Sequence, residues 1–482
     1  MKIDPLETGF VPEAILATAH RDPGHTALIT RHGPVSYGQL SGDMLAAAHA
    51  LQARGLAPGT WLGIAAKDER THLTLSLAAM VGGCEHVSLG SHETDQARQE
   101  LLARLPRGLV LASDGGSVTS GPDLLDAATL LRETQQTRSI QRGGGALFTS
   151  SGSTGKPKLA HFDRATLVES FRRYRDTAGQ VVAQTISVEH GVGKKRAWRT
   201  LLSGGTLVMA EACGPAEVLK SCALYRVEKL FLSAYALADL AAQMPGQSIN
   251  TVTRGLHLVC TGSKIPLESA RSVAHALSAR VSVAYGTTET GTLCLTDLAG
   301  LERHPDSVGR PVEGIELRIT DPDGQTVAMG AEGLVAVRGK GCLNRYLDGA
   351  EAHRFRDGWF TPGDIGRQEP DGTLTLLGRE HDRMILNGMN IFPAEIERAA
   401  LRHPQVRMCA AFAIRSVLHG DIPALAYVAD PALEPPAMIA HCRNHLGPRA
   451  PRAAFARTSL PLNPQGKILR HLLAAEHSPP PS

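Results

Sequence analysis

The sequence predicts an α/β protein in which a hinge joins a large N-terminal body of doubly wound, mixed and parallel sheets to a small C-terminal α+β lid. Over residues 1–379, short apolar runs alternate with amphipathic stretches of helical period, as expected for strands that cross over through helices. This alternation then gives way to a hairpin and a compact unit, residues 380–482, of typical domain size. The length of 482 residues, about three typical domains, accommodates both parts.

The clearest element of the N-terminal body is a helix that begins at Ser36. Gln39 follows three residues later, which is the spacing of a capping box. We expect this helix to run through Met44–Ala48 and to end at Gly55. Apolar runs predict strands at Leu109–Leu111, Leu256–Cys260, Val281–Ala284 and Leu334–Val337.

The lid is expected to begin within Gly378–Asp382. Just before it, Asp371-Gly372 lies between two strand-like runs and predicts a hairpin turn. Pro393 can open a helix over Ala394–Arg402 because its missing N–H costs nothing in the first turn. The remaining elements predicted for the lid are strands at Met408–Ile414 and Leu425–Val428 and a helix near Pro436–Leu446.

Composition excludes several classes of protein. The 50 Lys and Arg against 47 Asp and Glu give a net charge of +3. A charge this small does not indicate binding to nucleic acid. No apolar run reaches the ~18 residues of a membrane span, and the N-terminus lacks the pattern of a signal peptide. The eight cysteines are scattered without a CxxC pair, which argues against a zinc ribbon or a disulfide framework. We therefore expect a cytoplasmic protein.

The densest motif is Ala146–Lys158, which reads ALFTSSGSTGKPK. An apolar strand leads into small hydroxyl residues and glycines, whose backbone N–H groups can approach a phosphate chain while the lysines add charge. It is not a Walker A loop, because Pro157 follows Gly155-Lys156 where Ser or Thr is required. The residues expected to bind phosphate are Ser150, Ser151, Gly152, Ser153, Thr154, Gly155, Lys156 and Lys158.

This loop and six downstream segments resemble the motifs of the adenylate-forming superfamily, also named the AMP-dependent synthetase/ligase family. The superfamily includes acyl- and aryl-CoA synthetases, luciferases and amino-acid adenylation domains. The resemblance covers nearly the whole chain in the family's order. The downstream segments are His190-Gly191-Val192-Gly193, Gly262-Ser263, Tyr285-Gly286-Thr287-Thr288-Glu289, Trp359–Asp364, Gly378–Asp382 with Gly388 and Glu395–Glu397, and Pro464–Arg470.

The resemblance implies a nucleotide site. Tyr285 offers an aromatic face to adenine, and Glu289 is the residue type that helps to hold Mg²⁺. Asp364 can accept hydrogen bonds from the ribose hydroxyls, and Arg379 adds a charged donor on the same sugar. Further nucleotide contacts are expected from Gly262, Ser263, Gly286, Thr287 and Thr288, and contacts to the acid from His190, Gly191, Gly262 and Gly286.

Lys467 is the residue that the implied chemistry most needs. Attack of a carboxylate on the α-phosphate of ATP brings two anions together, and a mobile ammonium that bridges them stabilises the transition state. The resemblance implies a second half-reaction in which a thiol attacks the acyl-adenylate after the small domain rotates about the hinge. Gly388, without a side chain, would let a pantetheine arm pass close to the backbone.

These motifs predict an ATP- and Mg²⁺-dependent acid–thiol ligase that makes an acyl- or aryl-adenylate and passes the acyl group to coenzyme A. One alternative is a stand-alone ligase that loads the phosphopantetheine of a separate acyl carrier protein, and a remote one is a non-catalytic, adenylate-binding regulatory protein. Residues 186–193 contain no aspartate to pair with an α-ammonium, which disfavours an amino-acid substrate. The sequence does not indicate whether the acid is fatty, aryl or hydroxyaryl, nor the oligomeric state.

Several positions depart from the family pattern. His381 stands at the hinge position that Asp or Lys usually holds, and we expect it to be a solvated histidine. Pro362 replaces a threonine, Leu159 a glycine and Ile385 a lysine. The helix after the acyl-site motif reads KKRAWR over Lys194–Arg199, and we expect its charges to face solvent. A basic side chain pointing inward would instead indicate a substrate with a second polar or anionic group.

Overall fold

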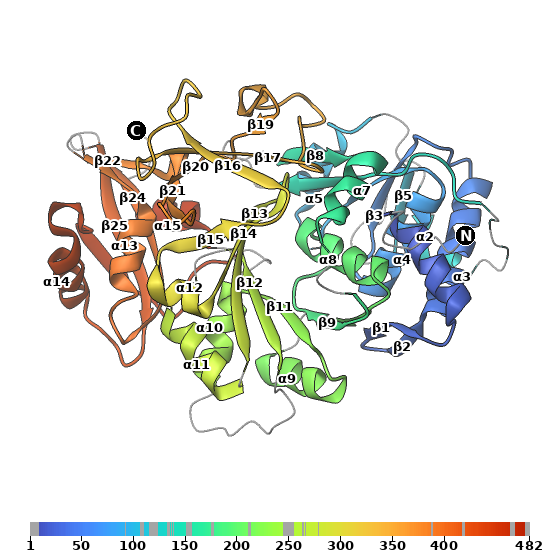
Figure 1. Cartoon of the computed structure of the whole chain (residues 1–482), viewed down its shortest axis with the longest axis horizontal. Coiled ribbons are helices and arrows are strands. Elements are labelled where there is room, and N and C mark those ends of the chain that lie inside the picture. Colours follow the sequence, from blue (N-terminus) through green and yellow to red (C-terminus); the bar gives the residue numbers. More distant parts are fainter. Residues whose placement is uncertain are drawn as a thin grey trace.

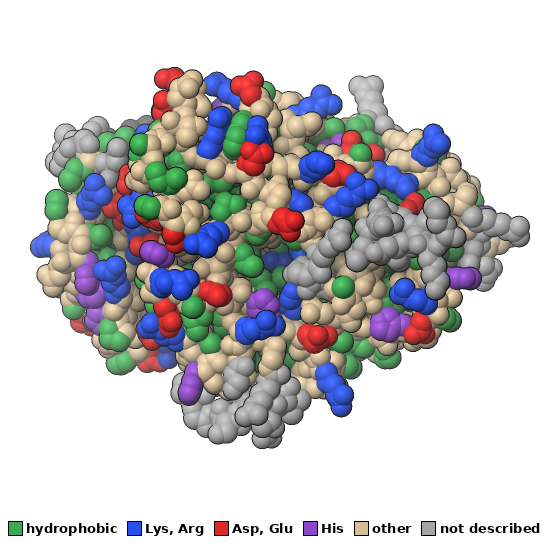
Figure 2. Space-filling model, viewed as in Figure 1, with side chains coloured by type: hydrophobic (Ala, Val, Ile, Leu, Met, Phe, Trp, Pro, Cys, Tyr) green, Lys and Arg blue, Asp and Glu red, His purple; other side chains and the backbone are tan. Residues whose placement is uncertain are grey.

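The structure is a computed structural model of the protein. It describes residues 9–477 except residues 92, 107–109, 115–123, 133–134, 136, 138, 151–156, 175–177, 211–213, 244–254, 263–264, 266, 278, 387–388, 417–419 and 463–467. The chain is mixed α/β, with two large sheets in the N-terminal body and a small sheet in the C-terminal part (Figure 1). On the face drawn in Figure 2, basic and acidic side chains are interspersed.

The first sheet has six strands in the order β6-β5-β3-β4-β7-β8, parallel except for the edge strand β8. The strands are β3 (Trp61–Ala65), β4 (Glu85–Ser88), β5 (Val110–Ser113), β6 (Leu124–Asp126), β7 (Ala146–Ser150) and β8 (Lys158–Phe162). Helices α2 (Val11–Arg21), α3 (Tyr37–Ala53) and α4 (Glu69–Val81) share a buried apolar core with one face, and α5 (Asp95–Leu102) packs on the other. Helices on both faces make this sheet doubly wound.

The second sheet has fifteen strands. Its first half runs β2-β1-β10-β9-β11-β12-β13 and is parallel from β1 to β13. These strands are β1 (Thr26–Thr30), β2 (Gly33–Ser36), β9 (Val181–Gln184), β10 (Thr206–Met209), β11 (Lys229–Ser233), β12 (His257–Thr261) and β13 (Arg280–Thr287). Four helices share a core with one face: α9 (Pro215–Leu224), α10 (Ala234–Gln243), α11 (Leu267–Leu277) and α12 (Leu298–Arg303).

The other half of this sheet is antiparallel and runs β14-β15-β21-β20-β17-β19-β18, with β16 paired to β17. Its strands are β14 (Gly291–Asp297), β15 (Ser307–Pro311), β16 (Ile315–Thr320), β17 (Gly333–Gly339), β18 (Phe355–Arg356), β19 (Trp359–Phe360), β20 (Asp364–Gln368) and β21 (Leu374–Arg379). β13 belongs to both halves, because it pairs in parallel with β12 and antiparallel with β14.

Helix α8 (Gly191–Leu202) lies between the two large sheets (Figure 1). On one side, the Trp198 ring is 6.1 Å from that of Phe148 in β7. On the other side, the guanidinium of Arg196 lies 4.2 Å from the ring centroid of Phe231 in β11. A helix in this position is covered from both directions, so that most of its side chains are buried.

The chain leaves the large sheet at Arg379 and enters a five-stranded sheet at Met384. The C-terminal strands are β22 (Met384–Leu386), β23 (Met389–Ile391), β24 (Val406–Ser416), β25 (Gly420–Ala429) and β26 (Ala453–Ala456). Helices α13 (Pro393–Ala400) and α14 (Pro435–Leu446) share a core with one face, and α15 (Arg470–His477) packs against the other. Arg398 on α13 reaches the body through Asp306, with Nε 3.6 Å from Oδ1.

The predicted helix cap at Ser36 and the predicted turn at Asp371-Gly372 are both confirmed. Ser36 caps α3, accepting a hydrogen bond from the Gln39 N–H at 3.2 Å, while Gln39 Oε1 accepts from the Ser36 N–H at 2.9 Å. Asp371-Gly372 turns between β20 and β21, with the glycine at φ +83°. Within the described ranges, no helix has both the length and the apolar character needed to cross a membrane.

Candidate functional site

The first group of predicted site residues gathers where parallel strands end. Because β9, β11, β12 and β13 run in one direction, their carboxyl ends share one edge of the sheet. Ligands of open α/β sheets bind outside such an edge. His190 is the N-cap of α8, soon after β9, Gly262 directly follows β12, and Tyr285-Gly286 lies near the end of β13.

Not every predicted residue can be placed. Of the phosphate loop, the structure describes Lys158 and the backbone of Ser150. Ser151, Gly152, Ser153, Thr154, Gly155, Lys156, Ser263, Gly388 and Lys467 lie outside the described residues.

Tyr285, Asp364 and Arg379 form one hydrogen-bonded and charged cluster. The Tyr285 hydroxyl donates to Asp364 Oδ2 at 2.5 Å, and Arg379 Nε lies 3.2 Å from Asp364 Oδ1. Asp364 and Arg379 are opposite each other in the β20–β21 pair, which explains their proximity. Burial, and then the negative charge of Asp364, raise the pKa of Tyr285, so that its hydroxyl remains a donor. Asp364 is only 5% exposed, yet each carboxylate oxygen has a second lone pair for another donor.

Glu289 is buried in the turn between β13 and β14. Its Oε1 accepts a hydrogen bond from the Tyr346 hydroxyl at 2.8 Å, and its backbone carbonyl accepts one from the Leu343 N–H at 2.8 Å. Burial, followed by the charge of Glu289, raises the pKa of Tyr346, which keeps the phenol protonated. The carboxylate is thereby fixed in one orientation by a neutral donor.

Two cations hold the backbone of the same turn. Lys195 on α8 donates to the Thr288 carbonyl at 3.0 Å, and Arg173 donates to the Thr290 carbonyl at 2.5 Å. Lys195 belongs to the basic stretch that was expected to face solvent, whereas Arg173 and Tyr346 lie in no motif, and Tyr346 is 57 positions from its partner Glu289. Two bulky basic side chains and a tyrosine therefore position a segment predicted to contact the nucleotide.

Lys158, which is predicted to bind phosphate, forms an ion pair with a carboxylate in the structure. Its Nζ is 2.6 Å from Glu351 Oε2, which also lies 2.6 Å from Arg354 Nε. Lys158 begins β8, and Leu159, which stands where the family has glycine, continues that strand as a fully buried residue paired with Thr149.

The predicted glycines are required for different physical reasons. A Cβ at Gly286 would lie 2.2 Å from the Gly291 carbonyl oxygen. Packing within the β13–β14 hairpin therefore requires glycine at position 286. A Cβ at Gly191 would lie 2.9 Å from the Phe148 ring. Gly262 has φ +99° and open space around its missing Cβ, and there the backbone conformation favours glycine.

The expectation that the charges of α8 face solvent is wrong. Lys194 is 1% exposed and Arg196 8%, and Lys195 is covered by the rings of Phe148 and Phe162, with its ammonium 4.7 and 3.5 Å from their centroids. The reason is the position of α8 between two sheets, where hydrogen-bond acceptors and aromatic rings receive the cations. His381, by contrast, is exposed as expected, with Nε2 3.4 Å from Asp382 Oδ1.

Lys194 forms a buried polar cluster with His72 and Ser88 beside the N-terminus of α8. Its Nζ donates to Ser88 Oγ at 2.6 Å and to His72 Nε2 at 3.0 Å. His72 Nδ1 lies 3.0 Å from the Ala66 carbonyl, so Nδ1 carries the proton and Nε2 accepts. Burial lowers the pKa of Lys194 to about 7; burial, and then the Lys194 charge, lower the pKa of His72 to about 3.

We expect this cluster to make stability rise with pH. Lys194 titrates near pH 7 when folded but near 10.4 when unfolded, so the unfolded chain binds more protons between these values. The free energy of unfolding should therefore increase from pH 7 to pH 9, and by about 1–2 kcal/mol more in the wild type than in Lys194→Met. Urea titrations at both pH values measure the difference, and equal increases in the two proteins would contradict it.

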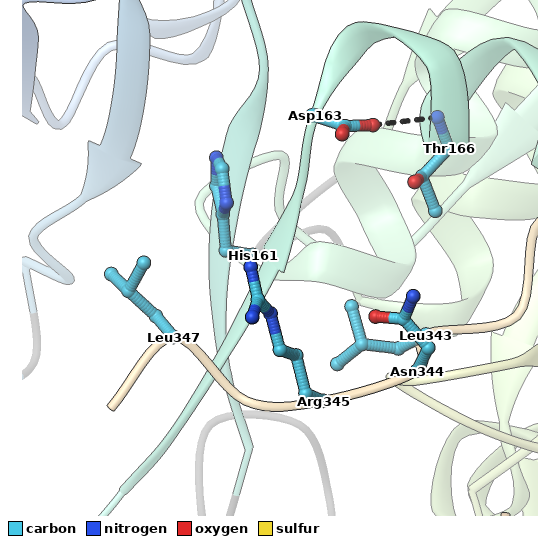
Figure 3. Close-up of a pocket in the computed structure, with 7 residues that line it drawn as sticks. All are labelled: His161, Asp163, Thr166, Leu343, Asn344, Arg345 and Leu347. Atoms are coloured by element: carbon cyan, nitrogen blue, oxygen red, sulfur yellow. Dashed lines mark hydrogen bonds between the residues drawn. The ribbon is translucent and has the colours of Figure 1, made fainter. Parts of the chain in front are cut away.

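A hollow lies beside the segment Leu343–Leu347, whose Leu343 N–H and Tyr346 hydroxyl donate hydrogen bonds to Glu289. It has a volume of about 370 Å³ and opens between β8, α7 (Arg164–Arg172) and the chain at Leu343–Leu347 (Figure 3). Asp163 there caps α7 by accepting from the Thr166 N–H at 2.8 Å. Its lining residues are His161, Asp163, Thr166, Leu343, Asn344, Arg345 and Leu347, none of them a predicted site residue.

Comparison with curated proteins finds acyl-CoA ligases. The chain is 28% identical over 494 residues to a feruloyl-CoA synthase of an Amycolatopsis species, which covers 94% of this chain and 96% of that protein. It is 35% identical over 196 residues to a long-chain-fatty-acid–CoA ligase of Salmonella typhimurium; that match spans 40% of this chain and 35% of the relative.

Solved structures share the fold along almost the whole chain. An o-succinylbenzoate CoA synthetase from Bacillus subtilis, in complex with its acyl-adenylate intermediate, superposes with a TM-score of 0.84 at 23% identity and covers 96% of this chain and 98% of its own. An amide bond synthetase from Marinactinospora thermotolerans gives a TM-score of 0.82 at 22% identity and covers 98% of this chain and 100% of its own.

Family models match both parts of the chain. Residues 395–467 match the C-terminal domain of AMP-binding enzymes, and residues 15–347 match the AMP-binding enzyme model itself. Since the second match spans well over half of the sequence, this protein belongs to the AMP-binding enzyme family, the adenylate-forming enzymes that include the acyl- and aryl-CoA ligases.

Proposed function

We propose that the protein activates a carboxylic acid with ATP, forming an acyl-adenylate and pyrophosphate, and then transfers the acyl group to the thiol of coenzyme A. The observation that carries this proposal is the cluster of Tyr285, Asp364 and Arg379 beside the strand ends. A buried carboxylate with spare lone pairs suits two ribose hydroxyls, and the Tyr285 hydroxyl is engaged with Asp364 while its ring is left for a base. The family membership supports the same reading.

The residues present fit a single magnesium ion. In the described part of the chain, no group of three or more His, Cys, Asp or Glu side chains could hold a metal by itself. Mg²⁺ keeps several waters and takes one or two carboxylates together with substrate phosphates, so Glu289 alone is a suitable protein ligand. When bound, the ion would neutralise charge on the phosphates. Tyr346 would keep the Glu289 carboxylate oriented toward it.

The other residues bind and orient the reactants. His190 and the first turn of α8 would flank the acid, and the turn that Lys195 and Arg173 hold would present Thr287 and Thr288 to the nucleotide. Lys467 would bring its ammonium to the carboxylate and the α-phosphate, because charge builds there in the transition state. The lid carrying Lys467, residues 380–482, is proposed to rotate about the hinge at Gly378–Asp382 so that the thiol can enter past Gly388.

Acid-dependent ATP–pyrophosphate exchange over fatty, aryl and hydroxyaryl acids tests this function. We expect one class of acid to stimulate exchange and the addition of coenzyme A to yield the acyl-CoA. Formation of an acylated carrier protein in place of acyl-CoA would identify a separate carrier protein, and not coenzyme A, as the acceptor. Measurable ATP binding with no exchange for any acid, including dicarboxylic acids, would contradict the proposal and favour a non-catalytic adenylate-binding protein.

A further inference from the structure

We propose that the acid activated by this protein is compact, with a short chain or a single ring, and that Arg196 and Phe231 together form the end wall of its binding site. This inference rests on the proposed acid activation and names the size class of the substrate. It follows from the side chains that fill the space between α8 and the large sheet beyond the first turn of the helix.

The space for the acid is open at the first turn of α8. His190 and Gly191, which are expected to contact the acid, cap and begin this helix. Val192, the next residue, is 41% exposed. Gly262, directly after β12, has open space around its missing Cβ. The start of α8 and the carboxyl ends of the parallel strands therefore leave room for a ligand.

Arg196 closes this space one turn further along α8. It follows Val192 by four residues and so lies on the same face of the helix. Helical side chains lean toward the N-terminus, which brings the guanidinium back toward the first turn. The guanidinium lies 4.2 Å from the ring centroid of Phe231 in β11. Arg196 is 8% exposed and Phe231 5%, so the helix and the sheet are in contact at this level.

The face of the large sheet that carries Phe231 is covered as well. Val182, Val259 and Ala284 form one apolar cluster with Phe231, and none of the four is more than 7% exposed. The alternate residues of these strands belong to the core shared with α9–α12, so the cluster faces the opposite side, toward α8. An acid that extends farther than about one helical turn, ~5 Å, would have to displace Arg196 or Phe231.

The side of α8 that faces the six-stranded sheet is closed too. A Cβ at Gly191 would lie 2.9 Å from the Phe148 ring, and the buried Trp198 ring is 6.1 Å from that of Phe148. Lys194 donates to His72 at 3.0 Å on the same side. Because protein interiors are close-packed, a longer acid would strain these contacts.

The basic side chains that α8 points inward do not require a second acidic group on the substrate. Burial lowers the pKa of Lys194 and of Lys195 to about 7, while the charge of Glu189 acts on the first and that of Glu289 on the second to raise it. Arg196 is held against an aromatic ring. It therefore limits the length of the acid and does not pair with it.

ATP–pyrophosphate exchange with straight-chain acids from butanoate to palmitate, and with benzoate and biphenylcarboxylate, tests the size limit. We expect kcat/KM to be highest for a short-chain or single-ring acid and to fall by about 100-fold or more from that acid to dodecanoate. Arg196→Ala should raise kcat/KM for dodecanoate relative to the best wild-type acid by about 10–100-fold. Arg196→Lys keeps a long side chain at this position and should preserve most of the limit.

Arg199→Ala is the matched control. Arg199 lies on the same helix, with its guanidinium 3.5 Å from the Tyr174 ring, and its removal should leave the size preference intact. Wild-type exchange that is as efficient with dodecanoate or palmitate would overturn the size class and leave acid activation standing, and an unchanged ratio in Arg196→Ala would overturn the end wall. Exchange with no acid at all would overturn the proposed function, and this inference with it. If Arg196→Ala does not fold by circular dichroism, Phe231→Val, which opens the same space from the sheet, decides.

Discussion

Lys467→Ala should lower the rate of acid-dependent ATP–pyrophosphate exchange by about 10²–10³-fold, the scale of removing one charge-stabilising donor from an active site. The ammonium is needed most where the carboxylate and the α-phosphate approach each other, which is the transition state. The loss should therefore fall on kcat, with ATP binding changed by less than about threefold. Exchange kinetics and equilibrium binding of ATP measure the two effects separately.

Described residues on either side of Lys467 have contacts in the C-terminal part of the chain. Leu462 and Ile468 form an antiparallel bridge, and Arg470 Nη2 lies 2.7 Å from Glu397 Oε1 on α13. Lys220→Ala removes an exposed lysine on α9 and is the matched control. Equal exchange rates for the Lys467→Ala and Lys220→Ala proteins would refute the assignment.

Features of the fold that depend on neighbouring residues could be predicted from the sequence. The capping box of Ser36 and Gln39 satisfies N–H groups within one turn, and Asp371-Gly372 needs only its own two positions to reverse the chain. The antiparallel half of the large sheet could not be predicted in the same way. Ser307 of β15 pairs with Thr375 of β21, and no local pattern in either strand specifies a partner so distant in sequence.

The orientation of α8 could not be predicted either, and for a different reason. Sequence patterning assigns charged residues to the solvent face of a helix because it assumes one buried side. α8 has two, so that Lys194 and Arg196 are buried together with Trp198. Acceptors from distant segments, such as His72 Nε2 and the Thr288 carbonyl, make this burial possible, and they are recognised only in three dimensions.

In the candidate site too, the local motifs could be predicted from the sequence, and the contacts between distant segments could not. Its motifs follow one another in the sequence and were predicted as blocks, but the contacts that orient them cross between blocks. The hydroxyl of Tyr285, whose ring is expected to stack on adenine, donates to Asp364. Glu289 meets Tyr346, which lies in no motif. The sequence could therefore indicate which residue types the chemistry needs, whereas the structure shows which side chains hold them in place.

Glu289→Gln should lower exchange by about 10²-fold and raise the Mg²⁺ concentration for half-maximal exchange at least about tenfold. The substitution keeps the size of the side chain and an oxygen that can accept from Tyr346, so the main change is the lost negative charge. A divalent ion that also bridges phosphates depends on that charge, because the described residues offer it no cluster of other ligands. Exchange rates measured against Mg²⁺ at saturating ATP give both quantities.

Tyr346→Phe tests how much the orientation of the Glu289 carboxylate contributes when its negative charge is kept. It removes only the hydroxyl that donates to Glu289 Oε1, a hydrogen bond worth about 1–3 kcal/mol to a charged group. Exchange should fall by about tenfold, with a smaller rise in the Mg²⁺ requirement than for Glu289→Gln. Glu332→Gln, at an exposed acid, should change neither quantity. An unaltered Mg²⁺ dependence in Glu289→Gln would show that the carboxylate serves to fix the Thr288–Thr290 turn, and that the metal is held elsewhere.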